Sequence, residues 1–167
     1  MSEFSRPYDA ARLPADEQVL DASPAECAAL AQRFALVAVN TLTAKIALKA
    51  DGPTVRAAGR VQADIVQSCA VSGEDLAVRI DEPLTLRFVP SGESPAGDEE
   101  IELAAEELDD IEMENGRFDL GEAVAQTLAL AIDPYLEGPN AEEFRRKAGI
   151  LSEGEGGAFA ALKNLLK

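Results

Sequence analysis

The alternation of apolar and polar residues between positions 37 and 90 predicts three consecutive β-strands. The first run ends near Lys49, before the turn signal Asp51-Gly52-Pro53. The second run spans 55–65, and its polar positions are Arg56, Arg60, Gln62 and Asp64. The third begins after Ser72-Gly73-Glu74, and its Pro83 favours a bulge or an edge position. Short turns between these runs predict an antiparallel meander with one buried face.

One helix is predicted before this meander in the sequence, and another is predicted after it. Ser23-Pro24-Ala25-Glu26 has the pattern of a capping box with proline at the first helical position, and an apolar stripe follows it. Asp119-Leu120-Gly121-Glu122 is a second such start, and Asp133-Pro134 ends the apolar stripe that follows. We therefore expect helices near 24–36 and 119–133.

The remaining segments complete the expected fold. Residues 91–110 are rich in Ser, Gly, Pro and acidic residues and predict a loop, whereas 111–118 predicts a short strand with an Asn115-Gly116 turn. A helical turn is expected at 141–147. The fold class is therefore α+β: an antiparallel β-sheet meander packed by two main helices, with an acidic loop and a short C-terminal helix. We expect residues 37–90 and 111–118 to form one antiparallel sheet. We expect residues 1–153 to form a single domain.

Residues 154–167 are predicted to be a Gly-rich linker followed by an amphipathic tail. Gly154, Gly156 and Gly157 favour flexibility. The apolar residues after them recur at helical spacing, at Phe159, Leu162, Leu165 and Leu166. A helix this short is not stable alone in water, so the stripe is expected to dock on its own domain or in a partner's groove.

The composition excludes several classes of chemistry. The 167 residues include no histidine and two cysteines. A histidine-based triad and a four-ligand structural zinc site from one chain are therefore excluded. We expect no enzyme activity, no metal site and no cofactor.

The chain is strongly acidic, with 31 Asp and Glu against 15 Lys and Arg, and most of the net charge of −16 lies after residue 90. Binding to nucleic acid depends largely on clustered basic residues, so we expect no DNA binding and weak RNA binding at best. The acidic segment 93–122 is either a solvated loop or a surface for a basic protein partner. A small metal-dependent hydrolase using segment 93–122 is the alternative hypothesis.

The sequence also favours a particular compartment. No apolar run follows the N-terminal Arg6, so no secretory signal is predicted, and no stretch is long and apolar enough for a membrane span. Cys27 and Cys69 do not suggest a disulfide scaffold. We expect a cytoplasmic protein with reduced thiols and no membrane contact.

Cys69 lies just after a predicted strand, in the turn sequence Cys69-Ala70-Val71-Ser72. A buried thiol that packs at the end of the sheet is the favoured interpretation. The other is a lone thiol or the remnant of a Cys-x-x-Cys knuckle, with Ser72 at the second cysteine position.

Five segments follow one another in a characteristic order: Gly59–Cys69, Ile80–Phe88, Phe118–Val124, Leu130–Tyr135 and the tail Ala158–Lys163. Their order resembles that of the YceD family, the 23S rRNA accumulation proteins of bacteria and plastids. The chain departs from the family at Ser72, where many members have the second cysteine, at Ala158, where proline is usual, and after Pro134, where further cysteines are absent. The resemblance implies a non-enzymatic role in 23S rRNA accumulation or large-subunit assembly. The implied partner is a ribosomal protein or a large-subunit assembly intermediate, and the tail is the expected contact.

Overall fold

The computed structural model describes residues 2–92 and 109–149. The chain divides into two compact units, which are treated separately below. The first unit contains residues 2–66 and, after a gap in sequence, the described residues of 77–132. The second contains residues 67–76 and the described residues from 133 to 149. The acidic loop 93–108 and the predicted tail at 154–167 lie outside the described residues.

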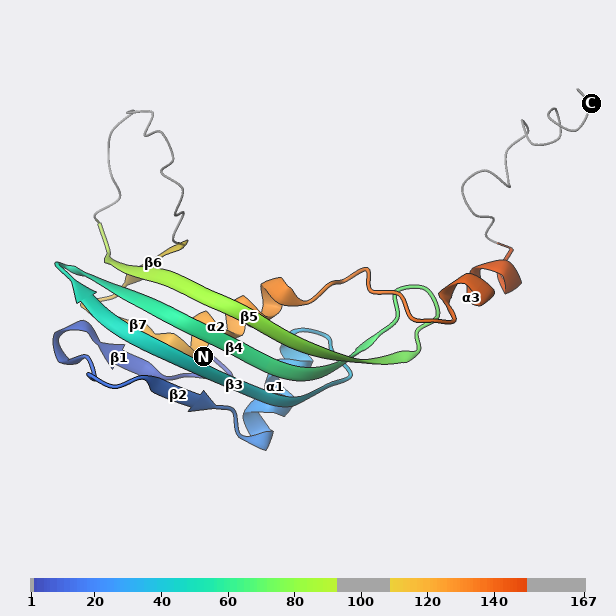
Figure 1. Ribbon diagram of the computed structural model, residues 1–167, viewed down its shortest axis with the longest axis horizontal. Coiled ribbons are helices and arrows are strands. Elements are labelled where there is room, and N and C mark those ends of the chain that lie inside the picture. Colours follow the sequence, from blue (N-terminus) through green and yellow to red (C-terminus); the bar gives the residue numbers. More distant parts are fainter. Residues whose placement is uncertain (1, 93–108, 150–167) are drawn as a thin grey trace, which may run out of the picture. The chain divides into compact units, whose positions relative to one another are not determined.

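A five-stranded sheet forms the larger part of the fold (Figure 1). Its order is β2 (Gln18–Asp21), β3 (Ala38–Asp51), β4 (Thr54–Ser68), β5 (Asp75–Pro90) and β6 (Asp109–Met113). β3 is antiparallel to both β2 and β4. The three long strands confirm the predicted meander, and the mixture of helices and strands confirms the α+β class.

The expected pairing of residues 111–118 was wrong in two respects. β6 pairs with β5 in the parallel direction, from Leu86↔Asp109 to Pro90↔Met113. β7 (Arg117–Asp119) pairs instead with β1 (Pro7–Asp9) in a separate two-stranded sheet. The long connection between β5 and β6 allows the parallel return, and the N-terminal strands β1 and β2 were not predicted at all. The alternation of side chains identifies a strand but not its partner.

The tight turn between β3 and β4 determines which residues lie opposite one another. Asp51 pairs with Thr54, so the loop contains only Gly52 and Pro53. Gly52 has φ 60°, the left-handed conformation that glycine provides at the first position of a two-residue hairpin turn. The same register places Lys45 opposite Arg60 and Lys49 opposite Arg56.

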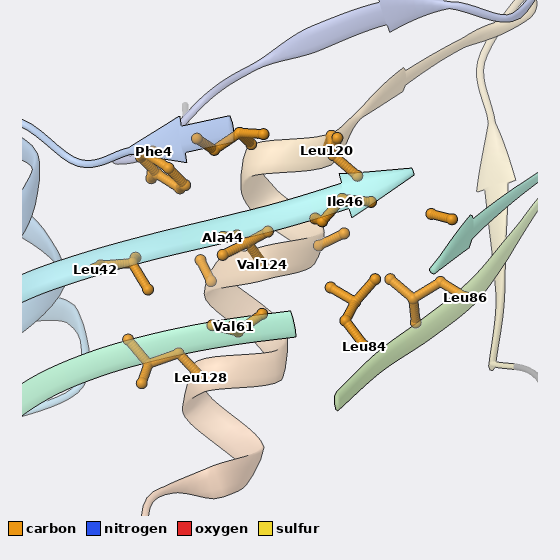
Figure 2. Packing of buried hydrophobic residues seen from close by; sticks show 14 of the residues in the cluster. Phe4, Leu42, Ala44, Ile46, Val61, Leu84, Leu86, Leu120, Val124 and Leu128 are labelled. Carbon is orange, nitrogen blue, oxygen red and sulfur yellow. The ribbon is translucent and has the colours of Figure 1, made fainter. Parts of the chain in front are cut away.

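Helices α1 (Pro24–Arg33) and α2 (Leu120–Ala131) cover one face of the sheet (Figure 1). Their buried residues pack with the inward residues of β3, β4 and β5 in one core (Figure 2). Within that core, Val124 and Leu128 of α2 lie close to Ala44 and Val61. The opposite face of the three long strands carries the polar residues of the alternation, and it is the exposed one.

The two helix starts differ in how closely they follow the sequence pattern. Ser23 and Glu26 form a complete capping box on α1, but the helix ends at Arg33 rather than near Leu36, because Ala35 adopts a left-handed conformation with φ 53°. At α2, the Asp119 side chain accepts a hydrogen bond from the Glu122 backbone N–H at 3.1 Å. The Glu122 carboxylate binds Arg33 and Ser2 instead of completing the box.

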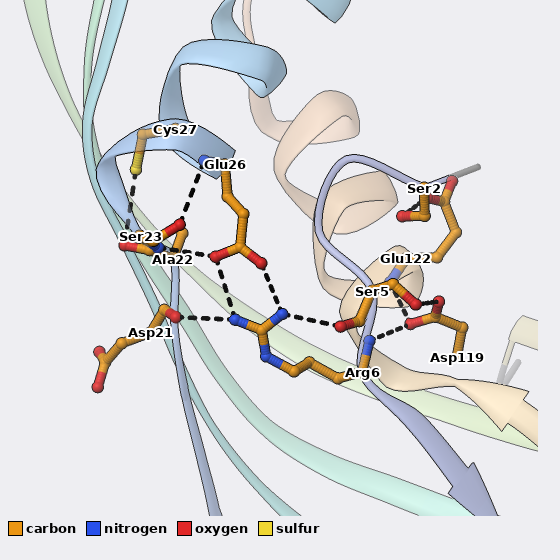
Figure 3. Close-up of polar contacts among 10 residues, drawn as sticks. All are labelled: Ser2, Ser5, Arg6, Asp21, Ala22, Ser23, Glu26, Cys27, Asp119 and Glu122. Carbon is orange, nitrogen blue, oxygen red and sulfur yellow. Dashed lines mark hydrogen bonds and ion pairs between the residues drawn. The ribbon is translucent and has the colours of Figure 1, made fainter.

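A polar network joins the N-terminal segment to the starts of both helices (Figure 3). Arg6 donates two hydrogen bonds to the Glu26 carboxylate, at 2.7 and 3.1 Å, and its backbone N–H donates to Asp119 at 2.7 Å. These bonds hold the segment against α2, where Gly121 permits a close approach. A Cβ at position 121 would lie 2.2 Å from the Phe4 carbonyl oxygen.

The second unit contains a turn and the short helix α3 (Ala141–Lys147), which confirms the helical turn predicted there. In this unit the Gln67 side chain is buried and donates to the Asp133 carbonyl oxygen at 2.7 Å. The Ala70 backbone N–H donates to the Leu136 carbonyl oxygen at 2.9 Å. The two sequence segments of the unit are therefore held together by hydrogen bonds.

Candidate functional site

Cys69 is the centre of the turn in the second unit. The Cys69 backbone N–H donates to the Glu74 carbonyl oxygen at 2.7 Å, and its carbonyl accepts from Gly73 N–H at 3.0 Å. The sulfur accepts hydrogen bonds from the backbone N–H groups of Gly138, at 3.2 Å, and Ser72, at 3.4 Å. These bonds stabilise the thiolate, with Gly138 contributing most, and lower the pKa of Cys69 to about 7.

Ser72 donates its backbone N–H to the Cys69 sulfur and also contacts Glu74. The Ser72 hydroxyl donates to the Glu74 carboxylate at 2.9 Å, and Asn140 donates to the same carboxylate at 2.9 Å. Cys69 is buried and has no disulfide partner. Within residues 2–92 and 109–149, no three His, Cys, Asp or Glu side chains lie close enough to hold a metal ion. In the described residues, the sulfur therefore fastens the turn to the segment around Gly138.

The exposed face of the sheet is the first candidate interaction surface. β3, β4 and β5 together contain six of the 15 basic residues of the chain, and all six lie on outward or partly exposed positions: Lys45, Lys49, Arg56, Arg60, Arg79 and Arg87. The same three strands contain five of the 31 acidic residues. The three strands therefore carry one more basic than acidic residue, in a chain whose net charge is −16.

The second candidate surface is a groove between β5 and the end of α2. β6 pairs only with Leu86–Pro90, so the part of β5 around Pro83 has no strand on that side among the described residues. Glu82 and Asp109 line the groove, whose other lining residues are Pro83, Leu84, Thr85, Leu86, Thr127, Leu130 and Ala131. Leu130 is 85% exposed. Among the described residues, the groove therefore combines acidic groups with one exposed apolar side chain and no basic residue.

These features describe a class of protein: a small acidic α+β protein whose sheet has one face covered by helices and one exposed face. The sequence profile of the YceD family, described as large ribosomal RNA subunit accumulation protein, matches residues 57–166. The match covers more than half of the chain, so the chain belongs to the YceD family. The comparisons with curated proteins and with solved structures found no match.

Family membership confirms the resemblance inferred from the sequence and supports a role in accumulation of the rRNA of the large ribosomal subunit. Among the described residues, no helix is both long and apolar enough to cross a membrane. The predicted partner-binding residues Phe159, Leu162, Leu165 and Leu166 lie outside the described residues, so they stay a prediction. Both candidate surfaces were missed by the sequence analysis, although Arg56 and Arg60 had been placed on the polar face.

Proposed function

We propose that this protein acts by binding, without catalysis, to support 23S rRNA accumulation or assembly of the large ribosomal subunit in the cytoplasm. The family match supports the rRNA-related role. The observation that carries the proposed mode of action is the groove beside β5, because its chemistry suits a protein partner. Its partner is a ribosomal protein of the large subunit or an assembly intermediate that contains one.

The lining of the groove favours a cationic segment. Glu82 and Asp109 supply negative charge, and the C-terminal end of α2 adds the partial negative charge of its unpaired carbonyl groups. Leu130 offers an apolar anchor for a partner side chain. An extended basic segment of a ribosomal protein could satisfy all three features. Pro83 lacks a backbone donor, so side-chain contacts would contribute more than strand pairing.

The proposal is tested by capture of the tagged full-length protein from cell extract, followed by identification of the bound ribosomal proteins and rRNA. Wild-type protein should recover large-subunit proteins, and Leu130→Ser should recover much less. Val19→Ser is the matched control, because Val19 is 57% exposed and lies on β2. Equal recovery by both variants would overturn the role of the groove, and absence of large-subunit components with wild-type protein would overturn the proposed function.

The alternative, a small metal-dependent hydrolase that uses segment 93–122, stays a prediction. Calorimetric titration with divalent metal ions tests it directly. Stoichiometric binding in the micromolar range would support the hydrolase and would contradict a function by binding alone.

A further inference from the structure

Four basic side chains form two rows across the exposed face of β3 and β4. Lys45 lies directly opposite Arg60, and Lys49 lies directly opposite Arg56. All four side chains are exposed. Directly opposed residues have Cβ atoms about 5 Å apart, and four residues along a strand span about 13 Å. We call these four residues the basic strip.

Stability alone does not explain the basic strip. Like charges directly opposite one another on neighbouring strands destabilise a sheet. The chain has about twice as many acidic as basic residues, so two pairs of opposed basic residues in one hairpin are not a consequence of its composition. Lys45 and Lys49 make no ion pair among the described residues. The arrangement therefore suggests a ligand that supplies negative charge from outside.

The two arginines have acidic neighbours that a ligand could replace. Arg56 contacts Asp51 at 3.2 Å, and Arg60 contacts Asp81. Both pairs are exposed, and exposed ion pairs contribute about 1 kcal/mol or less. Exchange of a carboxylate for a phosphate would therefore cost little.

The surface between the two rows indicates what kind of polyanion fits. Ala47 lies opposite Ala58, so the row between the cations has only small exposed side chains. The outward positions of β3, β4 and β5 contain no aromatic residue on which an unpaired base could stack. A flat, cationic surface without stacking groups suits the sugar-phosphate backbone of RNA better than its bases.

We propose that the basic strip binds the phosphate backbone of RNA, with little dependence on base sequence. This site goes beyond the proposed groove for a protein partner, and its failure would leave the groove intact. Lys45, Lys49 and Arg56 precede residue 57, where the family match begins. The net charge of −16 repels phosphate at long range, so the affinity is low and is measurable at low salt.

The test measures binding of fluorescein-labelled double-stranded RNA of mixed sequence to the full-length protein by anisotropy, over a series of salt concentrations. The variant Lys45→Glu/Lys49→Glu is compared with Arg12→Glu/Arg146→Glu. Arg12 and Arg146 are also exposed and lie outside the strip, and both double variants change the net charge by the same amount. In the strip variant each new carboxylate lies opposite Arg60 or Arg56, so its melting temperature should not fall.

We expect the strip variant to lose affinity by about tenfold or more and the control variant to keep affinity close to wild type. With the duplex probe, Lys45→Gln/Lys49→Gln should make the slope of log affinity against log salt shallower by about 1.8, because each of the two lost phosphate contacts contributes about 0.9. Equal losses in both Glu variants, or no RNA binding by wild-type protein at low salt, would overturn the proposal. If the strip variant still recovers large-subunit proteins from extract, the proposed function stands separately.

Discussion

The sulfur of Cys69 accepts hydrogen bonds from the backbone N–H groups of Ser72 and Gly138. It is therefore the acceptor for both of these groups. A buried N–H without an acceptor is costly, so the atom at this position has to be an acceptor. This explains a buried cysteine at the end of β4 without any metal or redox chemistry.

We therefore predict that Cys69→Ser leaves the fold and the capture of large-subunit components nearly intact, because the serine oxygen also accepts hydrogen bonds. Cys69→Ala should have a lower melting temperature than Cys69→Ser, because it leaves Gly138 N–H without its acceptor. Thermal unfolding of the three proteins measures this difference. Stoichiometric zinc in the purified wild-type protein, lost in Cys69→Ser, would contradict the structural role.

The Glu26 carboxylate accepts hydrogen bonds from two residues, Arg6 and Ser23. It accepts two hydrogen bonds from Arg6 and one from the Ser23 backbone N–H at 2.8 Å. The Arg6 contacts contribute most, and together these bonds lower the pKa of Glu26 to about 2. The same direction holds at Glu122, where Arg33 contributes most and the pKa is also lowered to about 2. The ionised forms of both groups therefore stabilise the folded state.

This predicts a particular pH dependence for Glu26→Gln. The stabilisation by the Glu26 carboxylate is fully present above its ordinary pKa of 4.5 and is lost as the pH falls toward 2. At neutral pH the variant should lose about 1 kcal/mol of unfolding free energy, because the pair is partly exposed. Urea unfolding at several pH values measures this. A wild-type advantage that persists at pH 2 would contradict the assignment.

Among the elements, the β3–β4 hairpin has the strictest steric requirement. Gly59 lies opposite Ile46, and a Cβ at position 59 would lie 2.0 Å from the Lys45 carbonyl oxygen and 2.8 Å from the Ile46 Cα. Both atoms belong to the backbone, so a side-chain rotation cannot relieve the overlap. Glycine here permits close approach of the two strands that carry the basic strip.

Gly59→Ala should therefore lower the unfolding free energy by about 2 kcal/mol or more. Ala58→Val is the control, because position 58 is exposed and a β-branched residue suits an exposed strand position. Chemical denaturation of both variants checks the difference. A stable Gly59→Ala variant with unchanged RNA binding would show that the two strands do not require this close approach.

At the scale of the whole molecule, the N-terminal segment packs in the first unit, and the docking site of the C-terminal tail is a prediction. The N-terminal segment is part of the first unit, since Phe4 is fully buried and Arg6 binds both helix starts. For the tail, the sequence offers two sites of docking, its own domain or a partner, and we propose that the stripe Phe159, Leu162, Leu165 and Leu166 contacts the ribosomal partner.

Deletion of residues 158–167 tests that proposal. The melting temperature should stay almost unchanged, while recovery of large-subunit components from extract should be abolished. Full-length protein with Phe159→Ser and Leu162→Ser provides a milder variant of the same stripe. A fall in melting temperature of several degrees, equivalent to about 1 kcal/mol or more, would assign the stripe to the protein's own core.

The sequence by itself determined the elements whose signals are local. The capping pattern Ser23–Glu26, the left-handed turn at Asn115-Gly116 and the alternation through β3, β4 and β5 each depend on neighbouring residues, and the structure contains all three. On β5, the apolar residues before and after Pro83 are buried on the same face, because the side-chain period of a strand is two. These residues are Ile80, Leu84, Leu86 and Phe88.

Tertiary structure decided everything that depends on residues distant in the chain. The parallel pairing of β6, the separate β1–β7 sheet and the binding of Arg6 to Glu26 join segments whose local patterns do not name a partner. The basic strip lies between these cases. Its residues alternate visibly in the sequence, but only the two-residue turn at Gly52-Pro53 sets Lys45 against Arg60 and Lys49 against Arg56. A register shift of one residue would have moved every side chain of one strand to the opposite face, because neighbouring side chains on a strand point in opposite directions.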